Sequence, residues 1–237
     1  MRQIAVLTDV HGNLPALRSA LAAIAGAGCD AVYHTGDAIG IGPYPAECLD
    51  LLLRTPNIRF VMGNHDSWFA FGLPEPRPEW MSEGEVAHQH WTHAQLDPGL
   101  RSVVAGWPYA IEEEIEGGRV RFLHYALDET GRGFQWLGSN PRAEDLDAAF
   151  GGGTDLLCFG HDHALLDVTG RARYVNPGAL GCSVEPEARF AIVEIDAGRF
   201  SIDLRAASYD ATELMREFAR RGVPERDFIL KTFFSRR

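Results

Sequence analysis

The stretch LTDVHGN, residues 7–13, follows directly on the apolar run IAV. A short apolar run that ends at a turn signal is typical of a buried strand, so residues 3–8 are expected to form one. Pro15 favours a helix that begins just after this stretch, because proline is accepted in the first helical turn. Asp9 and His11 therefore lie where a strand gives way to a helix, which is a common position for ligand-binding side chains.

The first third of the chain alternates strand-like and helix-like segments. Apolar runs at residues 31–34 and 58–62 predict two further strands, and residues 14–27 and 45–53 predict the helices between them. Strands and helices that alternate in short units are typical of a parallel sheet with right-handed crossovers. The carboxyl ends of such strands meet at one edge of the sheet.

A helical insertion rich in Trp and His is expected at about residues 79–105. After it the sequence predicts mainly strands rather than alternating strands and helices. Residues 109–115 and 119–124 predict a hairpin that turns at Gly117 and Gly118. Further strands are expected at residues 155–159, 165–169, 172–175, 188–195 and 199–206.

A C-terminal helix and tail are expected at about residues 210–237, where Asp210 can cap the helix. The tail, residues 232–237, is apolar and then basic, and docks either on the body of the protein or on a second subunit. No internal repeat or linker is present, so a single domain over residues 1–237 is expected. Its predicted fold class is α/β, with two mixed sheets packed together and helices outside.

Composition and charge exclude some classes of function. The chain has 22 Lys and Arg against 33 Asp and Glu, a net charge of −11, which disfavours general nucleic-acid binding and attraction to anionic membranes. The four cysteines form no C-x-x-C pair and are interpreted as reduced thiols. No apolar run is long enough for a signal-peptide core or a spanning helix, so a cytoplasmic location without membrane partners is expected.

Short glycine-marked clusters of Asp, His and Asn follow five of the expected strands. They are TDVHGN at residues 8–13, TGD at 35–37, MGNHD at 62–66, LH at 123–124 and FGHDH at 159–163. Taken singly, each has an ordinary explanation as a helix cap, a turn or a satisfied core histidine. Five clusters at five strand ends indicate side chains that converge on one edge of the sheets.

The converging side chains suit a pair of metal ions, because seven of them could act as ligands and a single tetrahedral ion uses four. The seven are Asp9, His11, Asp37, Asn64, His124, His161 and His163. Imidazole and oxygen ligands without thiolate fit Mn, Fe, Zn or Ni. In a two-metal site one carboxylate bridges ions about 3.5–4 Å apart. His161 and His163 face the same side of an extended segment, so each can reach a different ion.

This set of motifs, D-x-H, G-D, G-N-H-D, H and G-H-x-H, resembles the calcineurin-like metallophosphoesterase superfamily over residues 9–163. The runs GDAIGIGP at residues 36–43 and NPG at 176–178 resemble its small bacterial and archaeal phosphoesterase branch. The resemblance implies a four-layer αββα sandwich with a dinuclear metal centre. The Asp-Arg-Gly and Arg elements typical of phosphoprotein Ser/Thr phosphatases are absent, which argues against that branch. Tyr125 also stands after His124 where the family usually has a glycine.

The resemblance further implies a role for each residue. The first metal would be held by Asp9, His11, Asp37 and His163. The second would be held by Asp37 as the bridge, with Asn64, His124 and His161. His65 would be the catalytic histidine beside the substrate phosphate, and Asp66 would orient it.

The expected activity is hydrolysis of phosphate esters with two divalent transition-metal ions, Mn favoured, through a metal-bridging hydroxide. Nucleotide-like or small phosphodiesters are the preferred substrates, and a small phosphorylated substrate is the expected partner. His65 would either donate a proton to the leaving oxygen or hydrogen-bond the phosphoryl oxygen.

The sequence leaves three alternatives about function and assembly undecided. The first alternative function is a phosphomonoesterase, of the protein phosphatase or dinucleoside polyphosphate hydrolase type. The second is a catalytically inactive scaffold that binds protein partners, which the complete ligand set disfavours. The sequence also leaves open whether the protein forms a homo-oligomer.

Four residues are weaker candidates for substrate binding. His90 and Trp91 belong to the His- and Trp-rich segment at residues 79–95, which either caps the cleft or is an ordinary half-buried helix. Tyr44 and Asn13 lie beside the motif loops, where core packing and helix capping are the alternatives.

Overall fold

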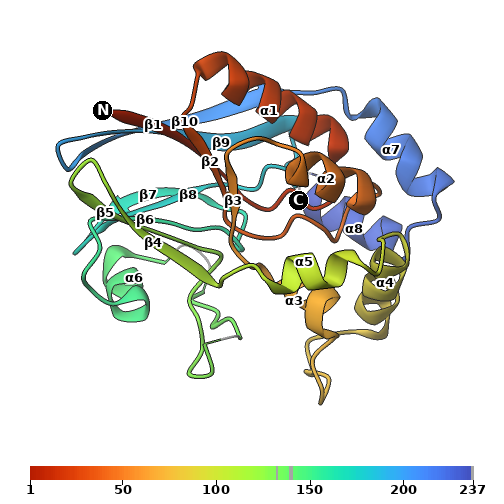
Figure 1. Ribbon diagram of the computed structural model, residues 1–237. Coiled ribbons are helices and arrows are strands. Elements are labelled where there is room, and N and C mark those ends of the chain that lie inside the picture. Colours follow the sequence, from red (N-terminus) through yellow and green to blue (C-terminus); the bar gives the residue numbers. More distant parts are fainter. Residues whose placement is uncertain (132, 139–140, 236–237) are drawn as a thin grey trace.

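Two five-stranded mixed sheets face each other and carry helices on their outer sides (Figure 1). The structure is a computed structural model that describes residues 1–131, 133–138 and 141–235. Helix α1 (Leu14–Ala27) lies over the first sheet, and α6 (Ala143–Phe150) lies on the outer side of the second (Figure 1). This confirms the predicted αββα arrangement.

The first sheet has the strand order β10-β9-β1-β2-β3. Its strands are β1 (Arg2–Leu7), β2 (Ala31–His34), β3 (Ile58–Phe60), β9 (Glu187–Asp196) and β10 (Arg199–Ser208). The first three are parallel, whereas β9 is antiparallel to β1 and to β10. The predicted crossover helices lie between the parallel strands, as α1 and α2 (Pro45–Leu53).

The second sheet has the strand order β4-β5-β6-β8-β7. Its strands are β4 (Ala110–Ile115), β5 (Gly118–Leu123), β6 (Leu156–Cys158), β7 (Leu165–Thr169) and β8 (Arg173–Pro177). The predicted hairpin is present as the antiparallel pair β4 and β5, and β5, β6 and β8 are parallel. The carboxyl ends of β5 and β6 therefore point the same way, as those of β1, β2 and β3 do in the first sheet.

The four layers enclose three hydrophobic clusters, because strands of both sheets bury both of their faces. In β1, Ile4 and Val6 pack between the sheets, whereas Ala5 and Leu7 pack under the helices. This alternation is the two-residue period of a strand applied to a continuous apolar run. At the centre of the inter-sheet cluster, Tyr33 and Phe122 stack with their ring centroids 3.8 Å apart.

Helices also form where the sequence indicated none. Those not predicted are α3 (Asn64–Phe71), α6 and α8 (Arg226–Phe233), whereas α5 (Leu100–Ala105) lies within the helical insertion expected at about residues 79–105. Helix α3 begins inside a motif that is typical of a turn. The others are short and have little apolar periodicity, so packing against the rest of the protein stabilises them. The predicted insertion helix is α4 (Glu83–Ala94), and the closing helix is α7 (Ala211–Arg220), capped by Asp210 as expected.

The C-terminal tail lies against the body of the chain. Phe233 and Phe234 are half-buried against the helical core cluster, and the Phe234 ring contacts Phe218 at 5.8 Å. The last two residues of the tail lie outside the described residues. None of the helices in the described part of the chain has the length and apolar character needed to cross a bilayer.

We expect Phe122→Ala to destabilise the protein by about 3–5 kcal/mol, because it empties the centre of the inter-sheet core. For a chain of this size the loss corresponds to a melting temperature lower by about 6–20 °C. Thermal unfolding followed by circular dichroism measures it. Phe71→Ala is the matched control, since Phe71 is 59% exposed. Equal losses in the two variants would contradict the packing assigned to Phe122.

Candidate metal centre

The seven predicted ligand side chains lie together at the edge where five parallel strands end. Asp9 and His11 follow β1, Asp37 follows β2, and Asn64 begins α3 just after β3. His124 follows β5 directly, and His161 and His163 follow β6. Loops from both sheets thus contribute to one cluster, although the residues span more than 150 positions of sequence.

A first group consists of Asp9, His11, Asp37 and His163. The Nε2 atom of His11 lies 3.0 Å from His163 Nε2, 3.5 Å from Asp9 Oδ1 and 3.7 Å from Asp37 Oδ2. His163 Nε2 also lies 3.5 Å from Asp9 Oδ1. Four potential ligand atoms therefore face a common point.

A second group consists of Asp37, Asn64, His124 and His161. The Nε2 atom of His124 lies 3.3 Å from Asp37 Oδ2 and 3.2 Å from both Asn64 Oδ1 and His161 Nδ1. His161 Nδ1 is 3.0 Å from Asn64 Oδ1. The same Asp37 oxygen thus borders both groups, as a bridging carboxylate must.

Backbone carbonyls orient two of the imidazoles. His11 Nδ1 donates to Ile39 O at 3.1 Å, and His124 Nδ1 donates to Thr35 O at 2.8 Å. A neutral imidazole that donates from Nδ1 keeps a lone pair on Nε2. Both rings therefore direct Nε2 into the cluster.

The backbone of the cluster is held in an unusual conformation. Asp9, His11, Asp37, His161 and His163 all have positive φ, between 47° and 76°. Side-chain-bearing residues rarely adopt this left-handed region, and each instance costs on the order of 1–3 kcal/mol. Five such residues in one cluster show that the rest of the fold holds a locally unfavourable backbone, which directs these side chains into the cluster.

Gly63 allows two of the loops to approach each other closely. A Cβ atom at this position would overlap the backbone nitrogen and the carboxylate of Asp37. The loop after β3 can therefore lie against Asp37 only if position 63 carries no side chain.

Electrostatics keeps the two buried carboxyl groups ionised. Burial raises the pKa of Asp9, but the nearby imidazoles of His11 and His163 outweigh it and hold the pKa well below its usual value. Burial likewise opposes ionisation of Asp37, but the charge of His124 outweighs it and lowers the Asp37 pKa. The pKa of His124 is lowered by burial but raised more strongly by Asp37, to about 9. The cluster is therefore a buried anionic site that attracts positive charge.

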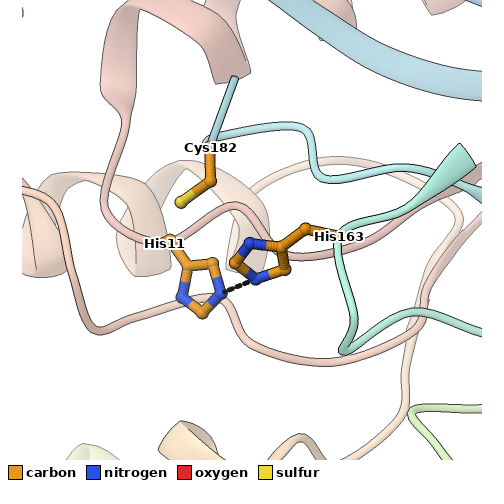
Figure 2. A group of neighbouring side chains, drawn as sticks. All are labelled: His11, His163 and Cys182. Atoms are coloured by element: carbon orange, nitrogen blue, oxygen red, sulfur yellow. Dashed lines mark hydrogen bonds between the residues drawn. The ribbon is translucent and has the colours of Figure 1, made fainter. Parts of the chain in front are cut away.

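The residues present fit bound cations. Asp9 Oδ1 is buried and accepts no hydrogen bond from any described residue, while Oδ2 accepts from Thr8 Oγ1 and from the His161 backbone. A buried, unpaired carboxylate oxygen is costly unless a cation occupies its open side. His11 Nε2 also lies 3.0 Å from His163 Nε2, within hydrogen-bond distance, so both ring nitrogens face the same point (Figure 2).

Cys182 is a neighbour of the first group that sequence reasoning missed. Its thiol, a ring nitrogen of His11 and a ring nitrogen of His163 lie within 4.8 Å of one another. Figure 2 shows the sulfur directed toward the two imidazoles. Cys182 follows the NPG segment after β8, and no spacing motif links it to the histidines, so only the fold brings it there. A thiol thus lies beside ligands that were expected to be imidazole and oxygen alone.

Asp66 has a different role from the expected one. Its Oδ2 accepts from the backbone N–H groups of Asp37 and Gly63, at 2.7 and 3.1 Å, and its Oδ1 accepts from Ala38 N at 3.0 Å. Burial and the charge of Asp37 raise the pKa of Asp66 to about 7. Asp66 therefore ties the loops after β2 and β3 together, and it does not orient the ring of His65.

Among the described residues, Gln89 from α4 is the one that hydrogen-bonds the ring of His65. Its Nε2 lies 2.9 Å from His65 Nδ1 and 2.7 Å from Glu85 Oε1. Only the NH₂ end of an amide can donate to a carboxylate, so Glu85 sets which way the amide faces. Gln89 consequently donates to His65 Nδ1, which leaves the proton of the neutral ring on Nε2. The insertion was predicted as a helix, but this contact was not.

The four weaker candidates lie away from the cluster. Asn13 caps α1 through Ala16 N and donates to Gly181 O and to the Tyr209 hydroxyl. The Tyr44 hydroxyl donates to Glu213 at 3.0 Å.

His90 is exposed on the outward face of α4, whereas Trp91 packs against the helical core. Helical periodicity directs Gln89 rather than its two neighbours toward the cleft. Substrate binding by Asn13, Tyr44, His90 and Trp91 therefore stays a prediction.

We expect His65 to carry its proton on Nε2 in the native protein, and Gln89→Leu to produce a mixture of both tautomers. The reason is that leucine removes the only donor described at Nδ1. Long-range ¹H–¹⁵N NMR correlations of the imidazole distinguish the tautomers. Gln95→Leu, at the exposed end of the same helix, is the control and should leave the His65 spectrum unchanged. An unchanged spectrum in Gln89→Leu would show that the amide does not set the tautomer.

Comparison with known proteins agrees with this geometry. Residues 1–198 match the calcineurin-like phosphoesterase superfamily domain. An uncharacterized protein of Methanocaldococcus jannaschii, MJ0912, is 27% identical over 249 residues, with 94% of each chain covered. The crystal structure of a metallophosphoesterase from Sphaerobacter thermophilus matches with a TM-score of 0.71 and 25% identity over 96% of each chain. Hypothetical protein PH1004 of Pyrococcus horikoshii shares the fold, with a TM-score of 0.82 and 20% identity over the whole of both chains.

The family match covers most of the chain and includes all seven residues of the cluster. The chain belongs to the calcineurin-like phosphoesterase superfamily.

Proposed function

We propose that this protein hydrolyses phosphate esters, with small or nucleotide-like phosphodiesters as its substrates, using two divalent cations. The observation that carries the proposal is the position of Asp37 Oδ2, which lies 3.7 Å from His11 Nε2 in one group and 3.3 Å from His124 Nε2 in the other. A single carboxylate oxygen between two sets of imidazoles suits a pair of cations that share it.

The ligand sets follow from the two groups. Asp9, His11, Asp37 and His163 would hold one cation, and Asp37, Asn64, His124 and His161 the other. Cations bound there supply Lewis-acid stabilisation of phosphoryl oxygens and activation of a water molecule. Ile39 O and Thr35 O accept from Nδ1 of His11 and His124, so Nε2 of each ring is directed toward the proposed cations.

His65 is proposed to stabilise the leaving oxygen through a hydrogen bond from its ring. Its backbone N–H donates to Asp37 Oδ1 at 2.9 Å, which fixes the residue beside the shared carboxylate. Gln89 occupies Nδ1, so Nε2 is the nitrogen whose N–H can donate a hydrogen bond. Burial lowers the pKa of the ring, so His65 acts from its neutral form, as a hydrogen-bond donor to the leaving oxygen.

The charges at the cluster favour diesters over monoesters. The neighbouring groups that lower the pKa of Asp9 and Asp37 are histidines rather than arginines or lysines. A monoester brings two negative charges, which are normally matched by a guanidinium. The single charge of a diester requires less compensation beyond the cations themselves.

We expect Asp37→Asn to lose both metal ions and to lower hydrolysis of bis(4-nitrophenyl) phosphate by about a thousandfold or more, since several kcal/mol of metal stabilisation disappear. Metal content by elemental analysis and 4-nitrophenol release are the measurements. Asp50→Asn removes an equal charge from an exposed site and should change neither. Normal turnover in Asp37→Asn would refute the two-metal proposal, and absence of turnover in the Mn-loaded native protein would favour the scaffold alternative.

We further expect the Mn-loaded protein to hydrolyse bis(4-nitrophenyl) phosphate with a higher kcat/KM than 4-nitrophenyl phosphate. The comparison keeps the leaving group constant and changes the charge on the phosphate by one. A clear preference for the monoester would assign the protein to the phosphomonoesterase alternative.

A further inference from the structure

The NPG segment, residues 176–178, is a motif of the sequence that neither ligand group includes. It begins at the end of β8, which is the parallel neighbour of β6 in the second sheet. The loop that leaves β6 carries His161 and His163, so this histidine loop and the NPG segment follow adjacent strands. The two segments are in contact, because Ala179 N donates to His163 O at 3.4 Å.

The side chain of Asn176 hydrogen-bonds the histidine loop at two points. Its Nδ2 donates to Gly160 O at 3.2 Å and to Asp162 Oδ1 at 2.6 Å. Its Oδ1 accepts from Gly178 N at 2.9 Å. Because only the NH₂ end of an amide donates, the bond from Gly178 N fixes which end faces the loop. Asn176 is 0% exposed, so water does not reach these bonds.

The histidine loop depends on such support, because its backbone is unfavourable by itself. His161 and His163 have φ values of 76° and 60°. Asp162 lies between them, and its Oδ1 also accepts from Ala164 N at 3.1 Å. The Asp162 carboxylate thus organises the turn, and Asn176 attaches the turn to β8. Without this attachment the loop would relax toward favoured φ values, which would displace both imidazoles.

The chain that follows the NPG segment contacts the loop after β1. Leu180 N donates to Thr8 O at 3.0 Å, and Gly181 N donates to Asp9 O at 2.9 Å. Residues 176–181 consequently join two of the loops that carry predicted ligands, the one after β1 and the one after β6.

We propose that Asn176 is a positioning residue for both cations, which acts through the histidine loop and is not itself a ligand. His163 belongs to the first ligand group and His161 to the second, so displacement of this one loop weakens both sites. The inference rests on the proposed function, which supplies the two cations. It extends the determinants of metal affinity from the seven ligands to the NPG segment.

The test is Asn176→Leu, which keeps the branching of the side chain and removes all three of its hydrogen bonds. We expect the Kd for Mn²⁺ to rise about 10–100-fold at both sites, the usual effect of removing a group that orients metal ligands. Isothermal titration calorimetry on the metal-free protein measures both Kd values. The visible absorption of the Co²⁺-loaded variant should also change, because it depends on ligand geometry.

Asp162→Ala breaks the same hydrogen bond from the loop side. It should raise both Kd values in the same direction but by less, because the bond from Asn176 to Gly160 O remains. If Asn176→Leu does not fold, Asp162→Ala decides in its place.

Leu157→Ala is the matched control for a general loss of stability. Leu157 lies in β6 and is buried in the cluster that includes residues of α6, so alanine lowers the melting temperature but removes no hydrogen bond of the loop. Both Kd values and the Co²⁺ spectrum should stay as in the native protein. Native Kd values in Asn176→Leu and Asp162→Ala, or an equal rise in Leu157→Ala, would overturn the proposal.

Hydrolysis of bis(4-nitrophenyl) phosphate by the Mn-loaded native protein separates this inference from the proposed function. Hydrolysis together with unchanged Kd values in the variants would overturn the role of Asn176 alone. Weaker metal binding in the variants, without hydrolysis by the native protein, would leave the role of Asn176 standing and overturn the proposed function. Absence of metal binding by the native protein would overturn both.

Discussion

Two ionised carboxylates buried beside one another are the constraint on which this protein is built. Asp9 is fully buried and Asp37 is 2% exposed, yet histidines keep both ionised. Such a pair is unfavourable in a protein interior unless positive charge lies between or beside the carboxylates. The Asp9 oxygen without a hydrogen-bond partner among the described residues shows where that charge belongs. The negative charge of the two carboxylates is therefore fully compensated only when cations are bound.

The sandwich supplies the rigidity that this arrangement demands. Left-handed backbone at five cluster residues and the close approach at Gly63 are locally unfavourable, and they persist because packed strands hold both ends of each loop. Asp66 adds to this by fastening two of the loops through three backbone N–H groups. Packing in the three hydrophobic clusters thus stabilises the fold enough to hold the strained backbone of the site.

A second tier of structure surrounds the centre and comes from segments outside the motifs. Helix α4 places Gln89 against His65, and α8 places Phe233 against His163. These contacts give the insertion and the C-terminal segment a direct influence on His65 and His163. Selectivity can consequently change through α4 and α8, while the strand-end loops and their ligands stay the same.

The sequence by itself determined the order of most strands and helices, the αββα class and the seven side chains of the cluster, because each depends on local pattern. Apolar runs mark buried strands, and glycine-marked clusters of Asp, His and Asn mark their ends. Short helices such as α3 and α8 could not be predicted in this way, because packing against the rest of the protein rather than apolar periodicity stabilises them.

Only the tertiary structure decided which groups meet across long separations in sequence. It directed Asp66 to backbone amides, assigned Gln89 to His65, brought Cys182 beside His11 and His163, and turned His90 away from the cleft. Each outcome depends on helix rotation and loop docking, to which residues distant in sequence contribute. No local pattern encodes such relations, so packing of the whole chain alone settles them.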